Sequence, residues 1–574
     1  MNNVELEKAP FFLSEQQQSW VRDMFLQMSL TEKVGQVFCM TGVGNTDEEL
    51  REMVETYHPG AFMHRTGRAN AIRHANEVLQ QTTKVPLLIA ANAESGGIGM
   101  SEEGTFFGKQ LAVAATNDES FAYKLGYVCG KEGAALGFNW AFAPILDIDM
   151  NWRNPITNVR TFGADPKRVE RMGAAYIDGM ADAALGMAPC IKHFPGDGVD
   201  ERDQHLTPTV NSLSAGHWRE TYGRIYRTMI DKNVLTAMVG HILQPALTRE
   251  KCPEMPDKEM RPASTNRFLV EDVLRDELDF KGLVVTDATP MVGYSAQLPR
   301  RTTICASLMA GVDMLLFCKD VAEDQSAIMD GLRNGTVSME RLNQAVTRIL
   351  AVKAALGLPE AQRANALVPD ERELSMLSCP QHVSWAQSCA DQAITLVKDT
   401  QNLLPLCVQK TPRIRLTVLG EEESGGFGDN AAVGDLLRQA LIKEGFSVHV
   451  YDAKSMEHGE IFDAGVATMR RKFDLSLIVA NIATGSNHTT RRLDWITLMA
   501  ANAPWYVKDI PTLLISFANP YHLADAPYIS TCINCYSNNA YSVTACVEKL
   551  MGRSPFKGIS PVDAFCHIWG AAEW

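Results

Sequence analysis

The sequence predicts an α/β protein, in which a (β/α)8 TIM-like barrel is followed by an α/β sandwich domain. Three observations carry this prediction. The chain has 574 residues, enough for two to four domains at roughly 100–200 residues each. Eight short apolar segments, separated by helical or loop-like segments, precede residue 320. Six further strand-like segments follow a polar, proline-containing stretch.

Two helices are expected at the N-terminus. Ser14 with Gln17, and Ser29 with Glu32, have the spacing of capping boxes, in which each side chain caps the other residue's backbone N–H. Apolar residues recur at helical spacing after Ser14. One helix should therefore begin after Ser14 and a second after Ser29.

The eight strand-like segments are apolar throughout instead of alternating, which is typical of strands buried on both faces. Parallel strands joined by helical crossovers are the usual way to bury both faces, and eight such units predict a closed barrel. The segments are 37–40, 60–63, 87–91, 140–143, 188–192, 235–239, 283–286 and 314–317.

Polar side chains stand at or shortly after the ends of five of these segments. In a (β/α)8 barrel the carboxyl ends of the strands converge on the face where active sites are built, so these side chains should share one pocket. They are Asn92 and Glu94, Asp147 and Asp149, Lys192 and His193, His241, and Asp287.

The domain boundaries follow from a change of pattern. We expect the barrel domain over residues 1–355, a linker over 356–390 and the sandwich domain over 391–574. The linker is polar and contains three prolines. Strand-like segments and helical patterns such as 432–441 then alternate, which indicates an open, mostly parallel sheet. The segments are 394–397, 415–419, 447–451, 475–480, 512–517 and 528–533.

A glycine-rich turn follows residue 419, but it does not indicate a dinucleotide cofactor. Its four glycines, at 420, 425, 426 and 428, do not match G-x-G-x-x-G, and three glutamates would face a pyrophosphate. Asp452 follows the next strand. The Cys532-x-x-Cys535 pair has no second pair and no histidine ligands beside it, so no metal site is predicted. We expect no cofactor.

Charge and cysteine content narrow the function classes. The formal net charge is −14 and no Lys/Arg cluster stands out, which argues against a nucleic-acid or membrane-surface partner. No apolar run reaches the ~18 residues that span a bilayer, and the start lacks the pattern of a signal peptide. The 13 scattered cysteines suit a reducing compartment. We therefore expect a cytoplasmic protein, and a homodimer is compatible with the sequence.

The segment KHFPGDGVDERDQHLTP, residues 192–208, is where acid/base chemistry is expected. Pro195, Gly196 and Gly198 force an irregular loop after the strand. This loop presents Asp203 and His205 with one residue between them. A carboxylate can fix the tautomer of an imidazole and stabilise its protonated form, so the pair predicts a proton donor and acceptor near neutral pH.

Asp287 directly follows an apolar strand. Its neighbours should include Lys192, His193 and Arg160, which would lower the pKa of the carboxyl and keep it ionised as a nucleophile. Retaining glycoside hydrolysis needs such a carboxylate and a second group that protonates the leaving oxygen. Asp287 and the Asp203–His205 pair could fill these two roles.

These residues resemble glycoside hydrolase family 3, in its β-N-acetylglucosaminidase branch. The loop is similar to the branch signature K-H-F-P-G-x-G-x-x-x-x-D-x-H at every fixed position. The resemblance extends through residues 137–166, the segment around Asp287 and the start of the second domain, and so covers most of the chain.

The resemblance implies an exo-acting retaining glycosidase that removes terminal β-linked N-acetylglucosamine. Asp287 would be the nucleophile, His205 the general acid/base and Asp203 its orienting partner. The resemblance also implies residues that bind a small carbohydrate substrate: Lys192, His193 and Arg160. Asp147 and Asn92 join them as candidates from the strand ends.

Two departures from the family pattern bear on specificity. Asn92 stands nearest an aspartate that binds sugar hydroxyls in relatives, and because an amide also donates, the gluco/galacto preference is left open. Asp197 stands where a histidine is common, and the sequence assigns it no role. In the second domain, residues 487–492 form a basic loop that is either a solvated loop or a cover for the barrel mouth.

Three alternative functions are also compatible with the sequence. A neutral imidazole repels an incoming phosphate less than a carboxylate does, which would suit a glycoside phosphorylase. A β-glucosidase or broad β-hexosidase would share the same residues. A sugar-binding sensor without catalysis is a further class, although binding alone does not need a nucleophile with a paired acid/base.

Overall fold

A computed structural model of the chain describes residues 4–42, 44–183, 186–420, 432–451, 465–495 and 502–573. These residues form two compact units. The first unit comprises Met1–Phe107, Ala122–Asn151 and Pro166–Val383, and the second comprises Gly108–Phe121, Trp152–Asp165 and Ser384–Trp574.

The first unit is a closed barrel of eight parallel strands, in the order β1-β10-β9-β7-β5-β4-β3-β2. All eight predicted segments are confirmed as barrel strands. Their bounds are β1 Phe38–Gly42, β2 Ala61–His64, β3 Leu88–Ala91, β4 Trp140–Ala141, β5 Ala188–Phe194, β7 Thr236–Val239, β9 Leu283–Ala288 and β10 Met314–Leu316. A separate two-stranded sheet pairs β6, Thr209–Val210, with β8, Ile242–Leu243.

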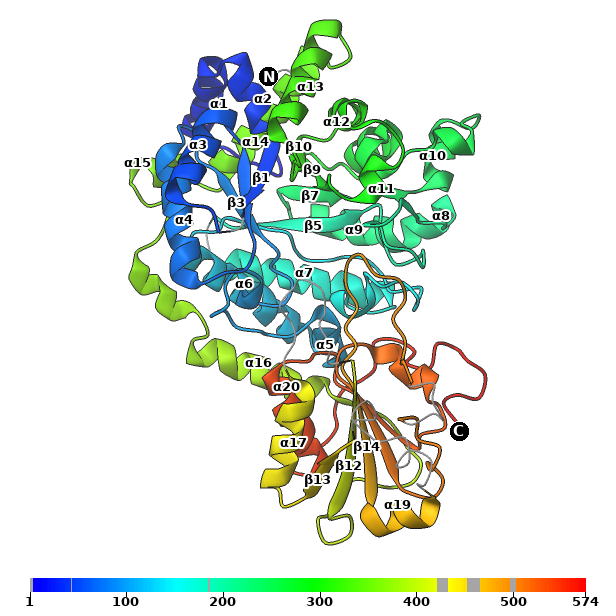
Figure 1. Cartoon of the computed structure of the whole chain (residues 1–574). Helices are drawn as coiled ribbons and strands as arrows, with labels where there is room; N and C mark the ends of the chain where they lie inside the picture. The colour runs from blue at the N-terminus through cyan, green and yellow to red at the C-terminus, as the bar shows by residue number, and fades with distance from the viewer. Residues whose placement is uncertain are drawn as a thin grey trace. The chain divides into compact units, whose positions relative to one another are not determined.

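Along the chain, helices alternate with the barrel strands (Figure 1). Both predicted capping boxes are confirmed, at the starts of α1 and α2. The helices are α1 Glu15–Gln27, α2 Leu30–Gln36, α3 Asp47–Tyr57, α4 Ala69–Thr82, α6 Glu119–Leu136, α7 Pro166–Ala183, α8 Ala215–Trp218, α9 Arg224–Ile230, α10 Pro245–Lys251, α11 Val292–Ser295, α12 Arg300–Met309, α13 Val321–Asn334, α14 Met339–Ala355 and α15 Leu358–Arg363. The 3-10 and π-helical segments are η1 Gly97–Gly99, η3 Arg219–Gly223, η4 Asp257–Glu259, η5 Ala263–Thr265, η6 Phe268–Glu277 and η7 Glu371–Met376.

Large apolar side chains and a few paired polar ones fill the barrel. Trp140 and Phe142 are buried in one cluster with residues from β1, β5, β9 and β10. The Trp140 indole N–H donates to the Thr236 hydroxyl at 2.9 Å, so the polar end of the ring is satisfied inside the core. The barrel interior is therefore a packed core, and a ligand can reach only its ends.

The second unit contains a six-stranded sheet in the order β11-β16-β15-β14-β12-β13. β11 is antiparallel to β16 and the other pairs are parallel, which confirms the predicted open, mostly parallel sheet. The strands are β11 Thr395–Asp399, β12 Arg413–Leu419, β13 Ser447–Val450, β14 Leu475–Ala480, β15 Thr512–Ser516 and β16 Thr531–Asn534. The helical segments are α5 Gln110–Ala115, η2 Asn158–Arg160, α16 Pro380–Ala393, α17 Val433–Lys443, α19 Val466–Lys472, η9 Pro520–Asp525 and α20 Ala540–Leu550.

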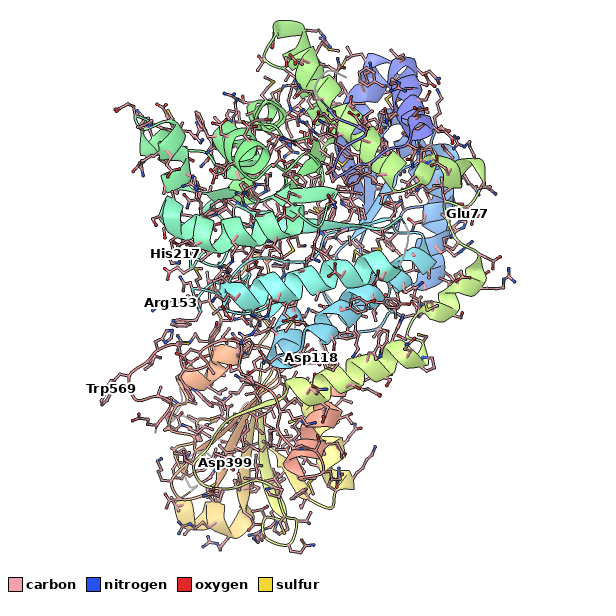
Figure 2. The ribbon with its side chains drawn as sticks, turned by 180° about the vertical axis from the view of Figure 1, so that it is seen from behind. Glu77, Asp118, Arg153, His217, Asp399 and Trp569 are labelled. Carbon is pink, nitrogen blue, oxygen red and sulfur yellow. The ribbon has the colours of Figure 1, made fainter. Side chains whose placement is uncertain are left out.

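Asp399 holds the antiparallel edge strand of this sheet in place (Figure 2). Its carboxylate accepts the Leu403 N–H at 3.0 Å and the Thr531 hydroxyl at 2.7 Å. It thus joins the turn after β11 to the neighbouring strand β16 by hydrogen bonds.

Two short segments far from residue 384 in the sequence also belong to the second unit, namely 108–121 and 152–165. Leu111 and Val159, one from each segment, are buried in one cluster with Tyr521 and Tyr536. Hydrophobic contacts of this kind join segments that are distant in sequence. No local sequence pattern therefore predicts that these two segments belong to the second unit.

Gly425, Gly426, Gly428 and Asp452 lie outside the described residues. Among the residues that are described, no helix is long and apolar enough to cross a membrane.

Candidate active site

Lys192 and His193 lie near the carboxyl end of β5. Both side chains are nearly buried, at 3% and 5% exposed. The chain then leaves the sheet through Pro195 and Gly196, whose φ of +113° belongs to a region that favours glycine. This break allows the following loop to return over the ends of the neighbouring strands.

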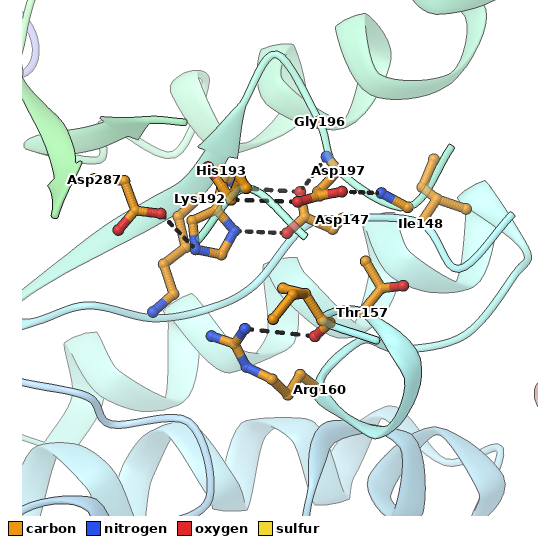
Figure 3. A network of polar contacts seen from close by, with 12 residues as sticks. Asp147, Ile148, Thr157, Arg160, Lys192, His193, Gly196, Asp197 and Asp287 are labelled. Atoms are coloured by element: carbon orange, nitrogen blue, oxygen red, sulfur yellow. Dashed lines mark hydrogen bonds and ion pairs between the residues drawn. The ribbon is translucent and has the colours of Figure 1, made fainter. Parts of the chain in front are cut away.

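Asp147 orients His193 (Figure 3). The His193 Nδ1–H donates to one Asp147 oxygen at 2.7 Å, and the His193 backbone N–H donates to the other at 3.2 Å. The Asp197 N–H donates to that second oxygen at 2.8 Å. Asp147 is 1% exposed. Both of its oxygens therefore face donors of the protein, and its most direct effect is on the imidazole.

The other nitrogen of His193 faces the candidate nucleophile. Its Nε2 lies 3.8 Å from Asp287 Oδ2, and the Asp287 side chain is 15% exposed. Burial by itself raises the pKa of the Asp287 carboxyl, but His193, His241, His205 and the Ala288 N–H outweigh burial and hold the pKa at about 2. Asp287 is therefore ionised at neutral pH, as a nucleophile requires.

His241, at the end of β7, is a second imidazole beside this carboxylate. Burial lowers the pKa of His241 to about 4, against the opposing effects of Asp287 and the Ala288 carbonyl, so the ring is neutral at pH 7. Its Nε2 lies 3.1 Å from the Ala288 oxygen, which can only accept, and Nδ1 lies 2.9 Å from the Ser264 hydroxyl. The Nε2–H tautomer follows, with Nδ1 accepting from Ser264.

Asp203 and His205 form the predicted pair. The His205 Nδ1–H donates to Asp203 Oδ1 at 2.7 Å, and the His205 backbone N–H donates to the same oxygen at 2.8 Å. The Asp203 side chain is fully buried, whereas His205 is 24% exposed. With Nδ1 committed to the carboxylate, Nε2 is the nitrogen that can exchange a proton with a ligand.

Lys192 is held by a residue to which the sequence assigned no role. Its Nζ donates to Glu94 Oε1 at 2.7 Å, and Glu94 is 16% exposed. Asn92, two residues earlier and directly after β3, is partly exposed. The ion pair fixes the position of the ammonium group, which retains further N–H donors for a ligand.

Arg160 belongs to the second unit, on η2, where its Nη1 donates to the Ile156 carbonyl at 3.4 Å. Its role in the barrel site stays a prediction. In the basic loop of the same unit, Arg492 pairs with Asp525 and its guanidinium lies 4.5 Å from the centre of the Trp152 ring. These contacts hold the loop within its own unit.

Seven of the eight candidate residues belong to the first unit: Asp287, His205, Asp203, Lys192, His193, Asp147 and Asn92. Contacts or electrostatic interactions join His193 to Asp147 and Asp287, and His205 to Asp203 and Asp287. The pairing of Glu94 with Lys192 was not predicted from the sequence, and neither Asp197 nor Gln204 had a predicted role. In the sequence, Glu94 is recognisable only as a polar residue that follows a predicted strand. Within the described residues, no group of three or more His, Cys, Asp or Glu side chains is arranged to hold a metal ion.

This arrangement combines an ionised, nearly buried carboxylate with an imidazole that has one nitrogen committed to a second carboxylate. The first group can form a covalent bond to an electrophilic carbon, and the second can donate a proton and then accept one.

Comparison with known proteins agrees with this chemistry. The family model described as "Glycosyl hydrolase family 3 N terminal domain" matches residues 29–352. A β-N-acetylglucosaminidase/β-glucosidase of Cellulomonas fimi is 41% identical over 567 residues, 99% of each chain. A β-hexosaminidase A of Pseudoalteromonas piscicida is 28% identical over 64% of each chain.

Among solved structures, a β-glucoside phosphorylase, BglX, is 43% identical and superposes with a TM-score of 0.93 over 100% of both chains. The similarity to this structure and to the Cellulomonas fimi protein extends over both units of the chain.

Proposed function

The chain belongs to glycosyl hydrolase family 3, and from this premise we propose that it is a retaining exo-glycosidase acting on terminal β-linked N-acetylglucosamine. Asp287 is the nucleophile, His205 the general acid/base and Asp203 the group that orients His205. The substrate is a small carbohydrate ending in this sugar.

In the first step, the Asp287 carboxylate attacks the anomeric carbon while protonated His205 donates its Nε2 proton to the glycosidic oxygen. The bond from the sugar to this oxygen breaks, the aglycone leaves as an alcohol, and a glycosyl-aspartate ester remains. In the second step, neutral His205 removes a proton from water, whose oxygen displaces the aspartate. Two inversions at the anomeric carbon give net retention.

The observation that carries this proposal is the 2.7 Å contact from His205 Nδ1 to the fully buried Asp203. The buried carboxylate stabilises the protonated imidazole that the first step requires. It also leaves the correct nitrogen, Nε2, to face the substrate.

β-Glucosides are a second class of donor. The relative that is similar over its whole length carries both activities in its name, β-N-acetylglucosaminidase and β-glucosidase. A broad β-hexosidase activity is therefore part of the proposal. Lys192 and His193 would contact hydroxyls that glucose and N-acetylglucosamine share, with Arg160 and Asn92 as further candidates.

Phosphate in place of water is the second candidate for the acceptor. A structure that is similar over the whole chain is named a β-glucoside phosphorylase. If the base were a carboxylate, its negative charge would repel the phosphate. At an effective dielectric of about 20 and a separation of ~5 Å, this repulsion costs roughly 3 kcal/mol for each negative charge on the phosphate. A neutral imidazole avoids this cost, so His205 favours phosphate attack more than a carboxylate base would.

Initial rates on p-nitrophenyl β-N-acetylglucosaminide and β-glucoside test the proposal. Asp287→Ala should abolish turnover, and His205→Ala should lower it by about 10²–10⁴-fold, the usual contribution of general acid/base catalysis. If Asp287→Ala kept its activity, or His205→Ala lost less than about tenfold, the assigned roles would be wrong. Tight sugar binding without turnover of either glycoside by the unaltered protein would support the sensor alternative instead.

Product analysis decides between the acceptors. The same reactions with and without phosphate should release free sugar if water is the acceptor, and sugar 1-phosphate if phosphate is. A rate indifferent to phosphate supports the hydrolase, whereas faster release accompanied by sugar 1-phosphate supports the phosphorylase.

The cytoplasm remains our proposed location. It is supported by the cysteines, most of which are buried, as suits thiols in a reducing compartment.

A further inference from the structure

Asp197 is a buried carboxylate beside the candidate site that the proposed mechanism does not use. It is 2% exposed. Its backbone is fixed on both sides, because its N–H donates to Asp147 at 2.8 Å (Figure 3) and its carbonyl accepts the Tyr222 hydroxyl at 2.5 Å. A buried charge held in this way needs partners for its carboxylate as well.

One partner of the Asp197 carboxylate is Gln204, the residue between Asp203 and His205. Asp197 Oδ1 accepts the Gly198 N–H at 2.7 Å, and Oδ2 accepts from Gln204 Nε2 at 3.3 Å. Gln204 is fully buried. Its amide orientation is determined, because Gln204 Oε1 accepts the His241 backbone N–H at 2.8 Å. The amide nitrogen must therefore face Asp197.

The backbone of this segment is attached to the chain that follows the nucleophile. The Val292 N–H donates to the His205 carbonyl at 2.9 Å, and the Gly293 N–H donates to the Gln204 carbonyl at 3.2 Å. A Cβ on Gly293 would lie 2.3 Å from the Gln204 oxygen, so the approach is as close as a glycine permits. Hydrogen bonds therefore join the acid/base segment, residues 203–205, to residues in the loops after β5, β7 and β9.

We propose that Asp197 is a positioning residue for the acid/base. Through Gln204 it sets where the Asp203–His205 pair lies relative to Asp287, and so governs proton transfer to the leaving group. This inference rests on the proposed function. Displacing a catalytic group by about 1 Å can cost on the order of 100-fold in rate, so the contact should be visible in the kinetics.

Asp197→Asn breaks the contact with almost no change in size. Two donors, the Gly198 N–H and the Gln204 NH₂, face the side chain at position 197. An asparagine there has one oxygen that can accept only on its own side, so its NH₂ group must face the other donor. Gln204 cannot turn its oxygen toward position 197 without losing the His241 N–H. Gln204→Met removes the same contact from the other side, together with the acceptor of the His241 N–H, and serves as the second variant.

Leaving-group dependence distinguishes positioning from a general structural defect. A dinitrophenyl glycoside needs little proton donation, whereas an unactivated phenyl glycoside depends on it. For Asp197→Asn and Gln204→Met, kcat/KM should fall by about tenfold or more on the phenyl glycoside. On the dinitrophenyl glycoside, glycosylation, measured as kcat/KM, should stay within about twofold, because proton donation contributes little there.

Three further variants complete the experiment. His205→Ala should show the same selectivity more strongly, and the double variant with Asp197→Asn should be no worse than His205→Ala alone, because both act on one step. Asp399→Asn is the matched control, since it removes a hydrogen-bonded carboxylate from the second unit's sheet and should show no selectivity between the two glycosides.

An equal loss on both glycosides by folded Asp197→Asn and Gln204→Met, or losses additive with that of His205→Ala, would overturn the positioning role. A His205→Ala variant without leaving-group dependence would refute the proposed acid/base instead. Circular dichroism and thermal unfolding establish which variants are folded. If Asp197→Asn does not fold, Gln204→Met alone decides, by the same selectivity.

Discussion

Three candidate side chains in the barrel, His193, His205 and Lys192, are each held by a carboxylate. Asp147 holds His193, Asp203 holds His205 and Glu94 holds Lys192, each at 2.7 Å. Nearly buried charges are stable only when they are paired and hydrogen-bonded. The same pairs reduce the number of orientations that each side chain can adopt, which prepares the site for its ligand.

The Lys192–Glu94 pair gives a prediction at this scale. Glu94→Gln should lower kcat/KM by about tenfold and Lys192→Met by about 100-fold, since a hydrogen bond to a charged group contributes roughly 1.5–3 kcal/mol. Steady-state kinetics on both p-nitrophenyl glycosides measures this. The double variant should be no worse than Lys192→Met, because Glu94 acts through Lys192.

Asp178→Asn is the matched control for this prediction. It removes a carboxylate from an exposed Lys232–Asp178 pair at 2.7 Å, and exposed pairs contribute little. Its kinetics should match those of the unaltered protein. Additive losses for the Glu94 and Lys192 variants would show that Glu94 has an independent role.

At the scale of elements, close approaches between helices in the first unit depend on glycine. A Cβ on Gly179 of α7 would lie 1.9 Å from the Tyr123 carbonyl oxygen of α6, and one on Gly126 of α6 would lie 2.0 Å from the Tyr176 carbonyl oxygen of α7. Backbone atoms cannot move aside as a flexible side chain can. The two glycines therefore set the spacing of these helices around the barrel.

Gly179→Ala should destabilise the first unit by about 1–3 kcal/mol, the usual cost of overpacking a filled core. Urea unfolding followed by far-UV circular dichroism measures the shift in midpoint. Gly216→Ala is the matched control, because a Cβ at this exposed position of α8 meets nothing within 4 Å. It should stabilise by roughly 0.5–1 kcal/mol, since alanine is the better helix former. Equal shifts for the two variants would refute the steric argument.

At the scale of the whole molecule, both units bury histidines in the neutral form. Burial lowers the pKa of His64 and His241 in the first unit to about 4, and that of His522 in the second unit to about 3. An unfolded histidine has a pKa of about 6.5. Between these values the unfolded chain binds more protons than the folded one, so stability falls as the pH falls.

Thermal unfolding midpoints should therefore decrease steadily from about pH 6.5 to pH 4 and change less between pH 7 and 8, where these histidines are neutral in both states. Scanning calorimetry across this range measures the effect. His64→Gln should flatten the dependence, since it removes one of the buried groups, even though it also lowers the midpoint at pH 7. Midpoints that did not change between pH 6.5 and 4 would contradict the assigned neutral state.

The sequence by itself determined the eight barrel strands, the two N-terminal capping boxes and the mostly parallel second sheet. It could do so because capping and burial on both faces leave local patterns. It also placed Asp287, Asp203 and His205 as candidates, because residues that follow strands of a barrel converge on one face.

Only the tertiary structure decided which side chains hold these candidates. Glu94 meets Lys192 across 98 positions of the chain, and segments 108–121 and 152–165 join the second unit through buried apolar contacts. Asp197 and Gln204 lie seven residues apart, yet their contact depends on a loop whose path is fixed by bonds to the chain after β7 and β9. Such contacts depend on side-chain positions that the whole fold sets, and no local pattern of residues encodes them.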